Sequence, residues 1–533
     1  MTLDISESQF ENSIESNLLK NGYLKREPIH FNKEYVIDDE LFFQFIQDTQ
    51  KESWQKLQEI HGDDIKEKIL QSYQKQVDLD SLIQVIRKGF TVSGIKLDCL
   101  FLKPENRLND TAEPLYQKNI LSVMRQVVTA DNNKPDLTLC LNGMPIATAE
   151  LKNPATGQNY EDAITQYKED RDPADKLFSF KRGALVHFAI DPNEVFMTTK
   201  LQKDKTQFLP FNQGKNDGKG NPDNPNGYNT AYLWESIWQI DSIIEIISNF
   251  VDLQIVQQKH PLPDKENIIF PRYHQLDAVL KLVESTRQNG AGKNYLVEHS
   301  TGSGKSNTIS WLAYKLLSLF DSQDKTIFDG ILVLSDRVGI VNQLGKTIQQ
   351  FEQTSGTVVA VRDSKDLADN LANKRRIVIS TQQKFPYVLD YISKVKGKKF
   401  AIIIDEAHSS QSPESRKKIQ EVLTTNLKEA EKQEGQIQSQ QQDIVDAIEK
   451  EMEIRGNQDT LSYYAFTATP KSKTLKLFGT PISDKVNVPF HVYSMRQAIE
   501  EGFILDVLKN YTTYERNFRI LKTASEDKVV EGK

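Results

Sequence analysis

The stretch LVEHSTGSGKSNTISWLA, residues 296–313, decides the fold class of this chain. An apolar run leads into a loop with two glycines, and a segment with helical apolar spacing follows, which predicts strand, loop and helix in that order. Gly302 and Gly304 let the backbone approach a polyphosphate. Lys305 would neutralise the phosphate charge, and Ser306 would ligate Mg²⁺. The residues that we expect to bind the nucleotide are Thr301, Gly302, Ser303, Gly304, Lys305 and Ser306.

A second strand end carries acidic residues where an α/β sheet binds its ligand. FAIIIDEAHSSQ, residues 400–411, places Asp405 and Glu406 at the carboxyl end of an apolar strand. Asp405 would hold Mg²⁺ through water, and Glu406 would orient or polarise the attacking water. His408 would link the nucleotide site to DNA in this interpretation, although a solitary histidine also occurs without such a role.

A third strand end and an upstream glutamine complete the predicted nucleotide site. Thr467 and Thr469 close the run AFTATP, residues 465–470, and would sense the γ-phosphate. Gln275 stands upstream of the glycine loop and would read the adenine edge, so that ATP is the expected nucleotide. An exposed glutamine on a helix is the alternative interpretation of Gln275.

From residue 268 onward, strand-like apolar runs alternate with helical segments, which is typical of a parallel α/β sheet. The motifs in about 268–480 resemble those of superfamily 2 helicase-like motors. In such motors, segments placed like 334–344 and 378–385 contact the DNA backbone, which binds DNA without reading its sequence. The resemblance implies these candidates for that contact: Arg337, Gln343, Thr381 and Gln382.

The upstream stretch KPDLTLCLNGMPIATAELKNP, residues 134–154, reads as a β-hairpin. Asn142 and Gly143 form a strong signal for its two-residue turn. Pro145 cannot donate a hydrogen bond to a strand ladder, so the returning strand is expected to carry a bulge or to lie at a sheet edge.

Two carboxylates and an ammonium group converge on this hairpin. Glu150 and Lys152 share one face because side chains alternate along a strand. Simple pairing across the turn places Asp136 opposite Ala149, and a one-residue bulge would place it opposite Glu150. Asp136 and Glu150 would hold Mg²⁺, which suits phosphodiester hydrolysis. Lys152 would position the nucleophile or stabilise the developing negative charge.

The Pro-Asp pair, the hairpin and the run ELKNP resemble the PD-(D/E)xK nuclease core. The whole of 134–154 resembles the nuclease region of type I restriction endonuclease motor (R) subunits, and residues 493–514 resemble the entry to their second motor lobe. The resemblance implies an ATP- and Mg²⁺-dependent type I site-specific deoxyribonuclease, which translocates double-stranded DNA and cuts it where it is unmodified. The implied partners are methylation (M) and specificity (S) subunits, and the DNA target is read by the separate specificity subunit.

Two features of that family carry over incompletely. A glutamate of the first helix often joins the nuclease metal site, and both Glu11 and Glu15 qualify here. A Gln-x-x-x-Tyr element usually follows the Glu-x-Lys motif, but Ala163 stands four residues before Tyr167, and Gln166 directly precedes it. The roles of Gln166 and Tyr167 therefore stay open at this point.

The predicted fold is α/β, with a restriction-endonuclease-like PD-(D/E)xK domain followed by a RecA-like P-loop domain. We expect the first at 1–259, with its core at about 90–200, and a first motor lobe at 260–480. The Gln- and Glu-rich stretch 411–458 would be a solvated helical insertion or, equally, a mobile linker. Residues 481–533 would begin a second lobe that is incomplete, so the expectation is a truncated subunit that binds ATP with little turnover.

Composition leaves the function open but excludes some classes. The chain has 533 residues, a net charge of −7 and two cysteines, which fits a globular protein of the reducing cytoplasm. No apolar run approaches the roughly 18 residues that a membrane span needs. Two other functions fit the motifs: a stand-alone nuclease–helicase of DNA repair and a catalytically silent remnant that binds DNA and ATP. Co-purification with M and S subunits would distinguish the restriction subunit from the repair enzyme.

Overall fold

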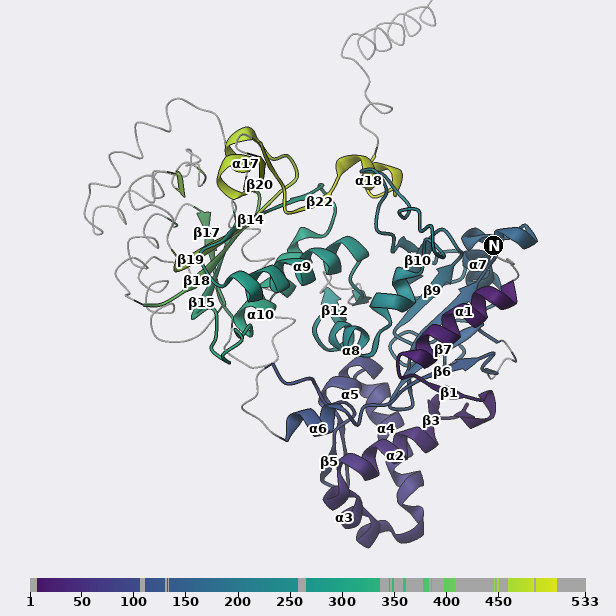
Figure 1. The fold of residues 1–533 in the computed structure, drawn as a ribbon. Helices are drawn as coiled ribbons and strands as arrows, with labels where there is room; N and C mark the ends of the chain where they lie inside the picture. The colour runs from purple at the N-terminus through teal and green to yellow at the C-terminus, as the bar shows by residue number, and fades with distance from the viewer. Residues whose placement is uncertain are drawn as a thin grey trace, which may run out of the picture.

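The computed structural model describes residues 7–105, 111–129, 132, 134–256, 265–335, 345, 348, 358–360, 377–382, 385, 397–407, 445, 448–449, 459–483 and 486–505. Two seven-stranded sheets form the centres of an N-terminal half and a C-terminal half (Figure 1). Helices accompany both sheets, so the predicted α/β class is confirmed.

The N-terminal sheet is mixed and has the order β1-β6-β7-β8-β9-β10-β11. Its strands are β1 (Leu24–Arg26), β6 (Leu121–Arg125), β7 (Leu137–Leu141), β8 (Met144–Leu151), β9 (Val186–Ile190), β10 (Val195–Thr198) and β11 (Leu209–Pro210). Strand β8 runs antiparallel to β7 and parallel to β9, and every one of its residues is buried. Helix α1 (Glu7–Lys20) contacts β8, and helix α7 (Tyr160–Glu169) contacts β8 and β9.

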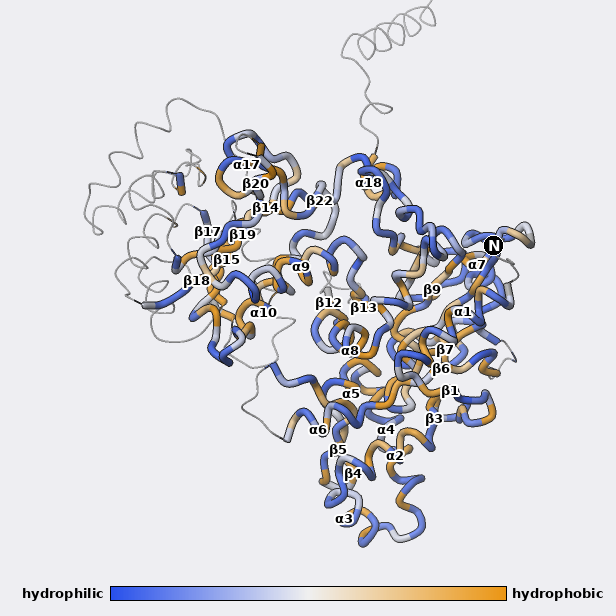
Figure 2. The backbone as a smooth tube through the Cα atoms, in the orientation of Figure 1, coloured by the Kyte–Doolittle hydropathy of each residue, from blue (hydrophilic) through white to orange (hydrophobic). Residues whose placement is uncertain are grey.

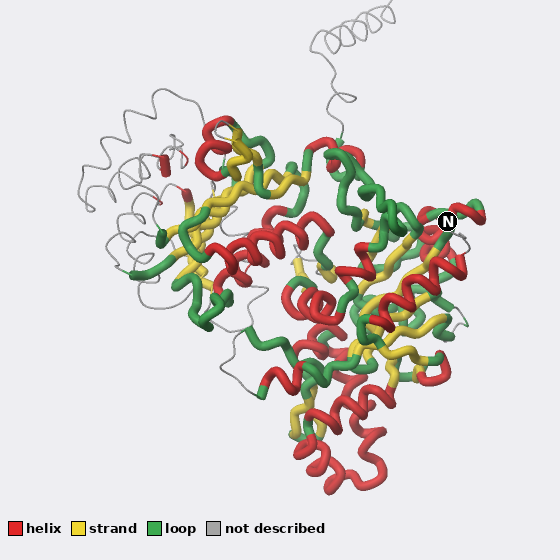
Figure 3. Tube along the Cα trace, in the orientation of Figure 1, coloured by secondary structure: helices red, strands yellow, loops and turns green. Residues whose placement is uncertain are grey.

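A mainly helical extension lies beside this sheet, at the lower end of the view in Figure 3. It consists of β2 (Phe31–Asn32), β3 (Ile37–Asp38), α2 (Asp39–Thr49), α3 (Lys51–His61), α4 (Ile65–Leu79), α5 (Leu82–Lys88), β4 (Phe90–Val92), β5 (Ile95–Leu97) and α6 (Ala112–Tyr116). Hydrophobic and hydrophilic residues alternate along its helices, as Figure 2 shows. The apolar residues form a core in which the Phe42 and Tyr73 rings lie 5.4 Å apart.

The β7–β8 hairpin has the turn that the sequence predicts. Asn142 and Gly143 have φ angles of 50° and 83°, as a two-residue type I′ turn requires. Cys140 pairs with Pro145, whereas the pairs farther from the turn are shifted by one residue. The expected bulge is therefore confirmed, and the alternative of an edge strand is wrong because β8 lies between two neighbours.

The C-terminal sheet is entirely parallel and has the order β16-β17-β15-β18-β19-β14-β22. Its strands are β14 (Asn294–His299), β15 (Gly330–Ser335), β16 (Val358–Ala360), β17 (Ile377–Thr381), β18 (Phe400–Ile404), β19 (Leu461–Thr467) and β22 (His491–Tyr493). The other described elements of this half are α9 (Tyr273–Asn289), α10 (Lys305–Leu317), α17 (Ser472–Phe478), β20 (Thr480–Ser483), β21 (Val486–Val488) and α18 (Met495–Glu500). The parallel sheet predicted from the alternating runs is confirmed.

The two halves pack against each other around helix α10. The connecting elements are α8 (Ile240–Asn249), β12 (Asp252–Val256) and β13 (Lys265–Ile269). The Phe250 ring lies 5.5 Å from the Trp311 ring of α10, between ring centroids. Lys315 Nζ, also on α10, lies 3.1 Å from Glu105 Oε1 and 2.9 Å from Glu245 Oε1. Apolar and charged contacts thus tie the helix after the glycine loop to the N-terminal half.

Most of the predicted insertion at 411–458 lies outside the described residues. Val445 and Ile448 are described, and both are buried in the same apolar core as Ala407 of the parallel-sheet half. Among the helices that the structure describes, none combines the length and the apolar character needed to cross a membrane.

Candidate nuclease and nucleotide sites

Asp136 and Glu150 come together where the β7–β8 ladder ends. The ladder pairs Leu137 with Ala149, so the next residue along each strand brings the two carboxylates opposite each other. Asp136 Oδ2 accepts a 2.7 Å hydrogen bond from the backbone N–H of Leu151. That bond fixes the Asp136 carboxylate against the strand that carries Glu150.

Glu150 is fully buried, and its partner is Arg171, which none of the sequence motifs includes. Arg171 Nε donates to Glu150 Oε1 at 2.7 Å, and only 5% of the Arg171 side chain is exposed. Burial and the nearby Asp136 charge raise the pKa of Glu150 to about 8, against the opposing effects of Arg171 and Lys152. Glu150 Oε2 is also buried, and no described residue hydrogen-bonds it.

Lys152 completes the predicted nuclease group. It lies two residues after Glu150, and its backbone N–H continues the ladder by donating to Ile190 O at 2.9 Å. The residue is 8% exposed, and its charge acts on the Glu150 carboxylate. The structure therefore brings Asp136, Glu150 and Lys152 together.

The two glutamates of helix α1 both reach Arg125 at the end of β6. Arg125 Nη2 lies 3.0 Å from Glu15 Oε2, and Arg125 Nε lies 3.5 Å from Glu11 Oε1. Glu15 Oε2 also pairs with Lys25 Nζ at 3.3 Å, and Glu15 is the more buried of the two carboxylates. Because Arg125 holds both side chains, the choice between Glu11 and Glu15 as a metal ligand stays a prediction.

Tyr167 braces the sheet from helix α7. Its hydroxyl and Thr148 Oγ1 lie 2.8 Å apart, and Thr148 Oγ1 lies 2.8 Å from His187 Nδ1 on β9. Ala163, four residues earlier, is buried and has no polar side chain to offer, and Gln166 is half-buried. Spacing is the one sequence signal that could have identified Arg171, since it follows Tyr167 by about one helical turn.

Acid should destabilise the fold partly through His187. Complete burial lowers the pKa of His187 from 6.5 to about 3, so the folded protein keeps it neutral while the unfolded chain takes up a proton. The free energy of unfolding should fall as the pH drops below 6.5, by about 2 kcal/mol at pH 5 from this residue. Urea unfolding at pH 7 and pH 5 measures it. A His187→Gln variant should show a smaller pH difference, and His61→Gln, at the surface, should keep the parent's difference.

The donor set of the nuclease group fits a divalent cation. A buried carboxylate oxygen without a hydrogen-bond partner is the kind of atom that a cation satisfies, and Glu150 Oε2 is one. Within the described part of the chain, no cluster of three or more His, Cys, Asp and Glu side chains is arranged to hold a metal ion. Asp136 and Glu150 would therefore hold the cation as a pair, with water or substrate oxygens filling the other positions.

The glycine loop has the geometry expected of a phosphate cradle. Gly302 and Gly304 have φ angles of 76° and 80°, which side-chain-bearing residues rarely adopt. Gly304 is the N-cap of α10, so the first N–H groups of that helix face the loop. A Cβ on Gly304 would lie 2.4 Å from Gln275 Nε2, so the Gln275 side chain would have to move to admit one.

Lys305 and Glu406 form an ion pair in the candidate nucleotide site. Lys305 Nζ lies 3.2 Å from Glu406 Oε1 and donates to His299 O at 3.3 Å. Glu406 has a φ angle of 54°, a left-handed conformation that turns the chain sharply after β18. Asp405 is 6% exposed, and its backbone N–H donates to Leu334 O of β15 at 2.8 Å. The predicted lysine and acidic residues therefore converge, with Ser306 partly buried on the first turn of α10.

Gln275 lies against the glycine loop and is only 4% exposed. Its Nε2 donates to Ser303 O at 3.2 Å and to Gly304 O at 3.0 Å, and its Oε1 accepts from the Arg272 backbone N–H at 3.0 Å. The two Nε2 bonds brace the loop, and the Oε1 bond holds the side chain to the N-terminus of its own helix, α9. The exposed-helix alternative is wrong because the side chain is buried, and recognition of adenine stays a prediction.

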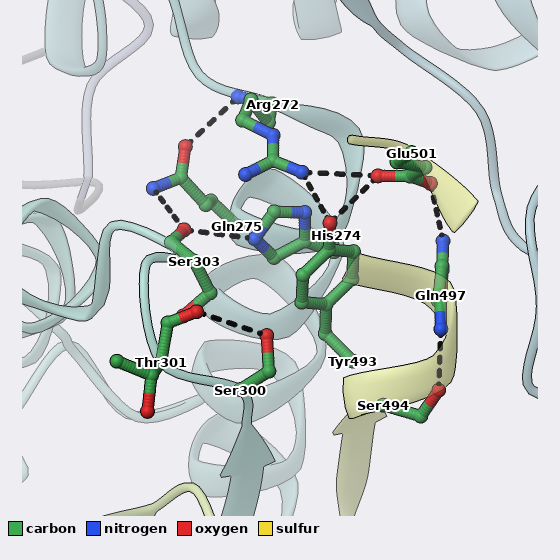
Figure 4. Close-up of polar contacts among 10 residues, drawn as sticks. All are labelled: Arg272, His274, Gln275, Ser300, Thr301, Ser303, Tyr493, Ser494, Gln497 and Glu501. Atoms are coloured by element: carbon green, nitrogen blue, oxygen red, sulfur yellow. Dashed lines mark hydrogen bonds and ion pairs between the residues drawn. The ribbon is translucent and has the colours of Figure 1, made fainter. Parts of the chain in front are cut away.

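A buried polar network continues from the loop to the segment after β22 (Figure 4). His274 Nε2 lies 3.0 Å from Ser303 O, and the His274 ring stacks on Tyr493 with centroids 3.7 Å apart. Tyr493 OH donates to Glu501 Oε2 at 2.6 Å, and Arg272 Nη2 lies 3.0 Å from the same oxygen. The sequence motifs do not reveal this network, because its members come from separate parts of the chain.

Some of the remaining residues predicted for the motor half lie in the part of the chain that the structure describes, and others lie outside it. Thr467 is buried at the end of β19, and its Oγ1 accepts from the backbone N–H of the exposed Thr469 at 3.3 Å. Thr381 ends β17, and Gln382 Nε2 donates to Asp405 O at 2.7 Å, which places Gln382 beside the nucleotide site. Three predicted residues lie outside the described part of the chain: Arg337, Gln343 and His408.

Models of two known protein families match this chain, one in each half of the structure. The family model described as type I restriction enzyme R protein N terminus matches residues 4–206, and the model described as SWI2/SNF2 ATPase matches residues 274–531. The chain is a homologue of type I restriction enzyme R subunits. In this R-subunit homologue the first match includes the Asp136–Glu150 hairpin, and the second includes the glycine loop, which implies ATP as the nucleotide.

Curated relatives come from staphylococci, among other organisms. The type I restriction enzyme SauCOLORF180P endonuclease subunit of Staphylococcus aureus strain COL is 24% identical over 425 residues, covering 78% of this chain and 38% of that protein. The SsaAORF53P endonuclease subunit of Staphylococcus saprophyticus is 22% identical over 435 residues, with the same two shares, 78% and 38%. The R-subunit homologue thus spans about two fifths of the length of these relatives.

Solved structures give a more distant similarity. The structure of a nuclease-deletion mutant of the Type ISP restriction-modification enzyme LlaGI in complex with a DNA substrate mimic is 16% identical, with a TM-score of 0.25. The similarity covers 47% of this chain and 22% of that chain.

Proposed function

We propose that this chain is a restriction subunit of a type I restriction-modification system, which uses ATP to translocate DNA and cuts unmodified double-stranded DNA with Mg²⁺. One observation carries the proposal. A single chain carries the Asp136–Glu150 carboxylate pair beside one sheet and the Lys305–Glu406 ion pair, next to the glycine loop, beside the other. The membership of its relatives in type I restriction enzymes supports the same conclusion.

In the nuclease site, the chain's own residues would arrange the cation and the scissile phosphate. Asp136 and Glu150 would hold Mg²⁺, which when bound supplies a Lewis acid and activates water. Lys152, on the same face as Glu150, would position the nucleophile or stabilise the negative charge that develops on the phosphate. The burial of Glu150 keeps bulk water away from this group, which strengthens its electrostatic interactions.

In the motor half, the backbone N–H groups of the glycine loop would bind the phosphates of ATP. Lys305 would exchange its 3.2 Å contact with Glu406 for the β and γ oxygens, which frees the carboxylate to orient the attacking water. Ser306 and Asp405 would hold the nucleotide's Mg²⁺, and Thr467 and Thr469 would respond to the γ-phosphate. Contacts to the DNA backbone are proposed for Thr381 and Gln382, together with two residues outside the described part: Arg337 and Gln343.

The proposed partners are double-stranded DNA and the M and S subunits of the same system, in the cytoplasm. In this scheme the S subunit reads the target sequence, so the chain itself needs only contacts that do not depend on sequence.

Cleavage of a plasmid that carries the cognate target tests the proposal directly. With ATP, Mg²⁺ and the M and S subunits, the parent should cut, and an Asp136→Ala variant should cut at least about 10²-fold more slowly because one of two metal ligands is gone. Asp170→Ala, an exposed change just after α7, is the matched control and should cut like the parent. If Asp136→Ala cuts as fast as the parent, the proposed metal site is wrong.

A further inference from the structure

We propose that Arg171 is a positioning residue of the nuclease site, which fixes the Glu150 carboxylate and the chain segment before Asp136 in one geometry for the cation. This inference deepens the proposed nuclease function and rests on it. Arg171 lies just beyond helix α7 and belongs to none of the motifs that identified the site.

The Arg171 guanidinium contacts the Glu150 carboxylate and also the backbone just before Asp136. Arg171 Nε donates to Glu150 Oε1 at 2.7 Å, and Arg171 Nη2 donates to Lys134 O at 3.2 Å. Lys134 is separated from Asp136 only by Pro135, a buried residue whose ring restricts the backbone. Arg171 therefore sets the position of the Asp136 segment relative to Glu150, because its planar fork has a fixed geometry.

The same contact decides which oxygen of Glu150 is available. Arg171 occupies Oε1, while Oε2 is buried without a hydrogen-bond partner in the described part of the chain. A carboxylate held through one oxygen cannot rotate freely, so Oε2 is pre-oriented for a cation. Partners of this kind, which hydrogen-bond a metal ligand rather than the metal, commonly orient the ligand and tune its affinity.

A merely stabilising ion pair would not require this placement. Taking both charges out of water costs about as much as their attraction returns, so a buried pair is weak evidence for a role in stability. Arg171 and Glu150 are 5% and 0% exposed, which makes that cost high. Arg171 reaches the Glu150 carboxylate from just beyond helix α7, and it does so with a hydrogen bond of 2.7 Å.

Cation binding tests the role of Arg171 without any need for cleavage. Mn²⁺ binding to the full chain is measured by electron paramagnetic resonance, without nucleotide or DNA, and Mg²⁺ is added as a competitor. Mn²⁺ that the parent binds and that Glu150→Gln does not bind is assigned to the nuclease site. The variants are Arg171→Met, which keeps the bulk of the side chain, and Arg171→Lys, which keeps the charge but cannot bridge both acceptors.

The expected result is a weaker cation site in both variants. Arg171→Met should weaken Mn²⁺ binding at the nuclease site by about 10–100-fold, and Arg171→Lys should fall between Met and the parent. Arg182→Met is the control, because Arg182 is 54% exposed and pairs with Asp78 away from this site, and it should bind Mn²⁺ like the parent. Binding in Arg171→Met that equals or exceeds the parent's overturns the inference. If Arg171→Met does not fold, parent-like binding in Arg171→Lys overturns it instead.

The experiment separates this inference from the proposed function. If Arg171→Met binds Mn²⁺ more weakly but the parent fails to cut DNA with M and S subunits, the proposed function fails while the positioning role stands. If the parent and Glu150→Gln bind the same amount of Mn²⁺, the positioning role is overturned, whatever the result of the cleavage assay.

Discussion

A Glu150→Gln variant should lose DNA cleavage by about 10³-fold or more, because roughly 4 kcal/mol of charge stabilisation depends on the cation that this carboxylate would hold. Glutamine has nearly the same shape and keeps an oxygen that can accept from Arg171 Nε, which lies 2.7 Å from Glu150 Oε1. It lacks the negative charge that a cation needs, so the site should stay folded but inactive.

Cleavage kinetics and thermal unfolding together measure this prediction. The rate is taken from plasmid cleavage under single-turnover conditions with ATP, Mg²⁺ and the M and S subunits. The matched control is Glu169→Gln at the exposed end of α7, which should cut like the parent. The melting temperatures of all three proteins should agree within about 4 °C, because the change leaves the buried packing intact. Cleavage by Glu150→Gln within tenfold of the parent would contradict the assignment.

A Lys305→Ala variant should bind ATP at least about 100-fold more weakly, a loss of roughly 3 kcal/mol that matches charge-assisted hydrogen bonds to the phosphates. In the structure, the Lys305 ammonium lies between Glu406 Oε1 and the carbonyl of His299. Its removal leaves the glycine loop without a cation while Glu406 remains negative, and this combination repels a triphosphate.

Titration with a fluorescent ATP analogue in the presence of Mg²⁺ measures this loss. Lys293→Ala is the matched control, since Lys293 is exposed immediately before β14 and should bind the analogue like the parent. Mn²⁺ binding at the nuclease site should be unchanged in Lys305→Ala, because that site lies on the other sheet. Unchanged affinity for the analogue would contradict the role of the glycine loop.

The β7–β8 hairpin and the glycine loop could both be predicted from the sequence, since each depends on neighbours in the chain. A two-residue turn fixes the register of the strands beside it, and Pro145 indicates the bulge that brings Asp136 opposite Glu150. The order of strand, loop and helix around Lys305 depends on periodicity and glycine content in the same local way. Physical constraints that act over a few residues therefore produce a sequence pattern from which the local structure can be predicted.

The burial of Gln275 could not be predicted from such local patterns. The sequence left a choice between adenine recognition and an exposed helical position, and burial against Ser303 and Gly304 excludes the second. Burial depends on which surfaces pack together after the sheet has formed, and residue spacing in the sequence does not predict that packing.

By itself, the sequence determined the α/β class, the β7–β8 hairpin and the glycine loop, because turn chemistry and strand periodicity act between near neighbours. Only the tertiary structure decided that Arg171 holds Glu150, 21 residues away, and that Arg272 pairs with Glu501 across 229 residues. It also showed both glutamates of α1 engaged with Arg125. These contacts depend on how helices pack on the sheets. A buried charge finds its partner by position in space, and the spacing of residues along the chain does not identify that partner.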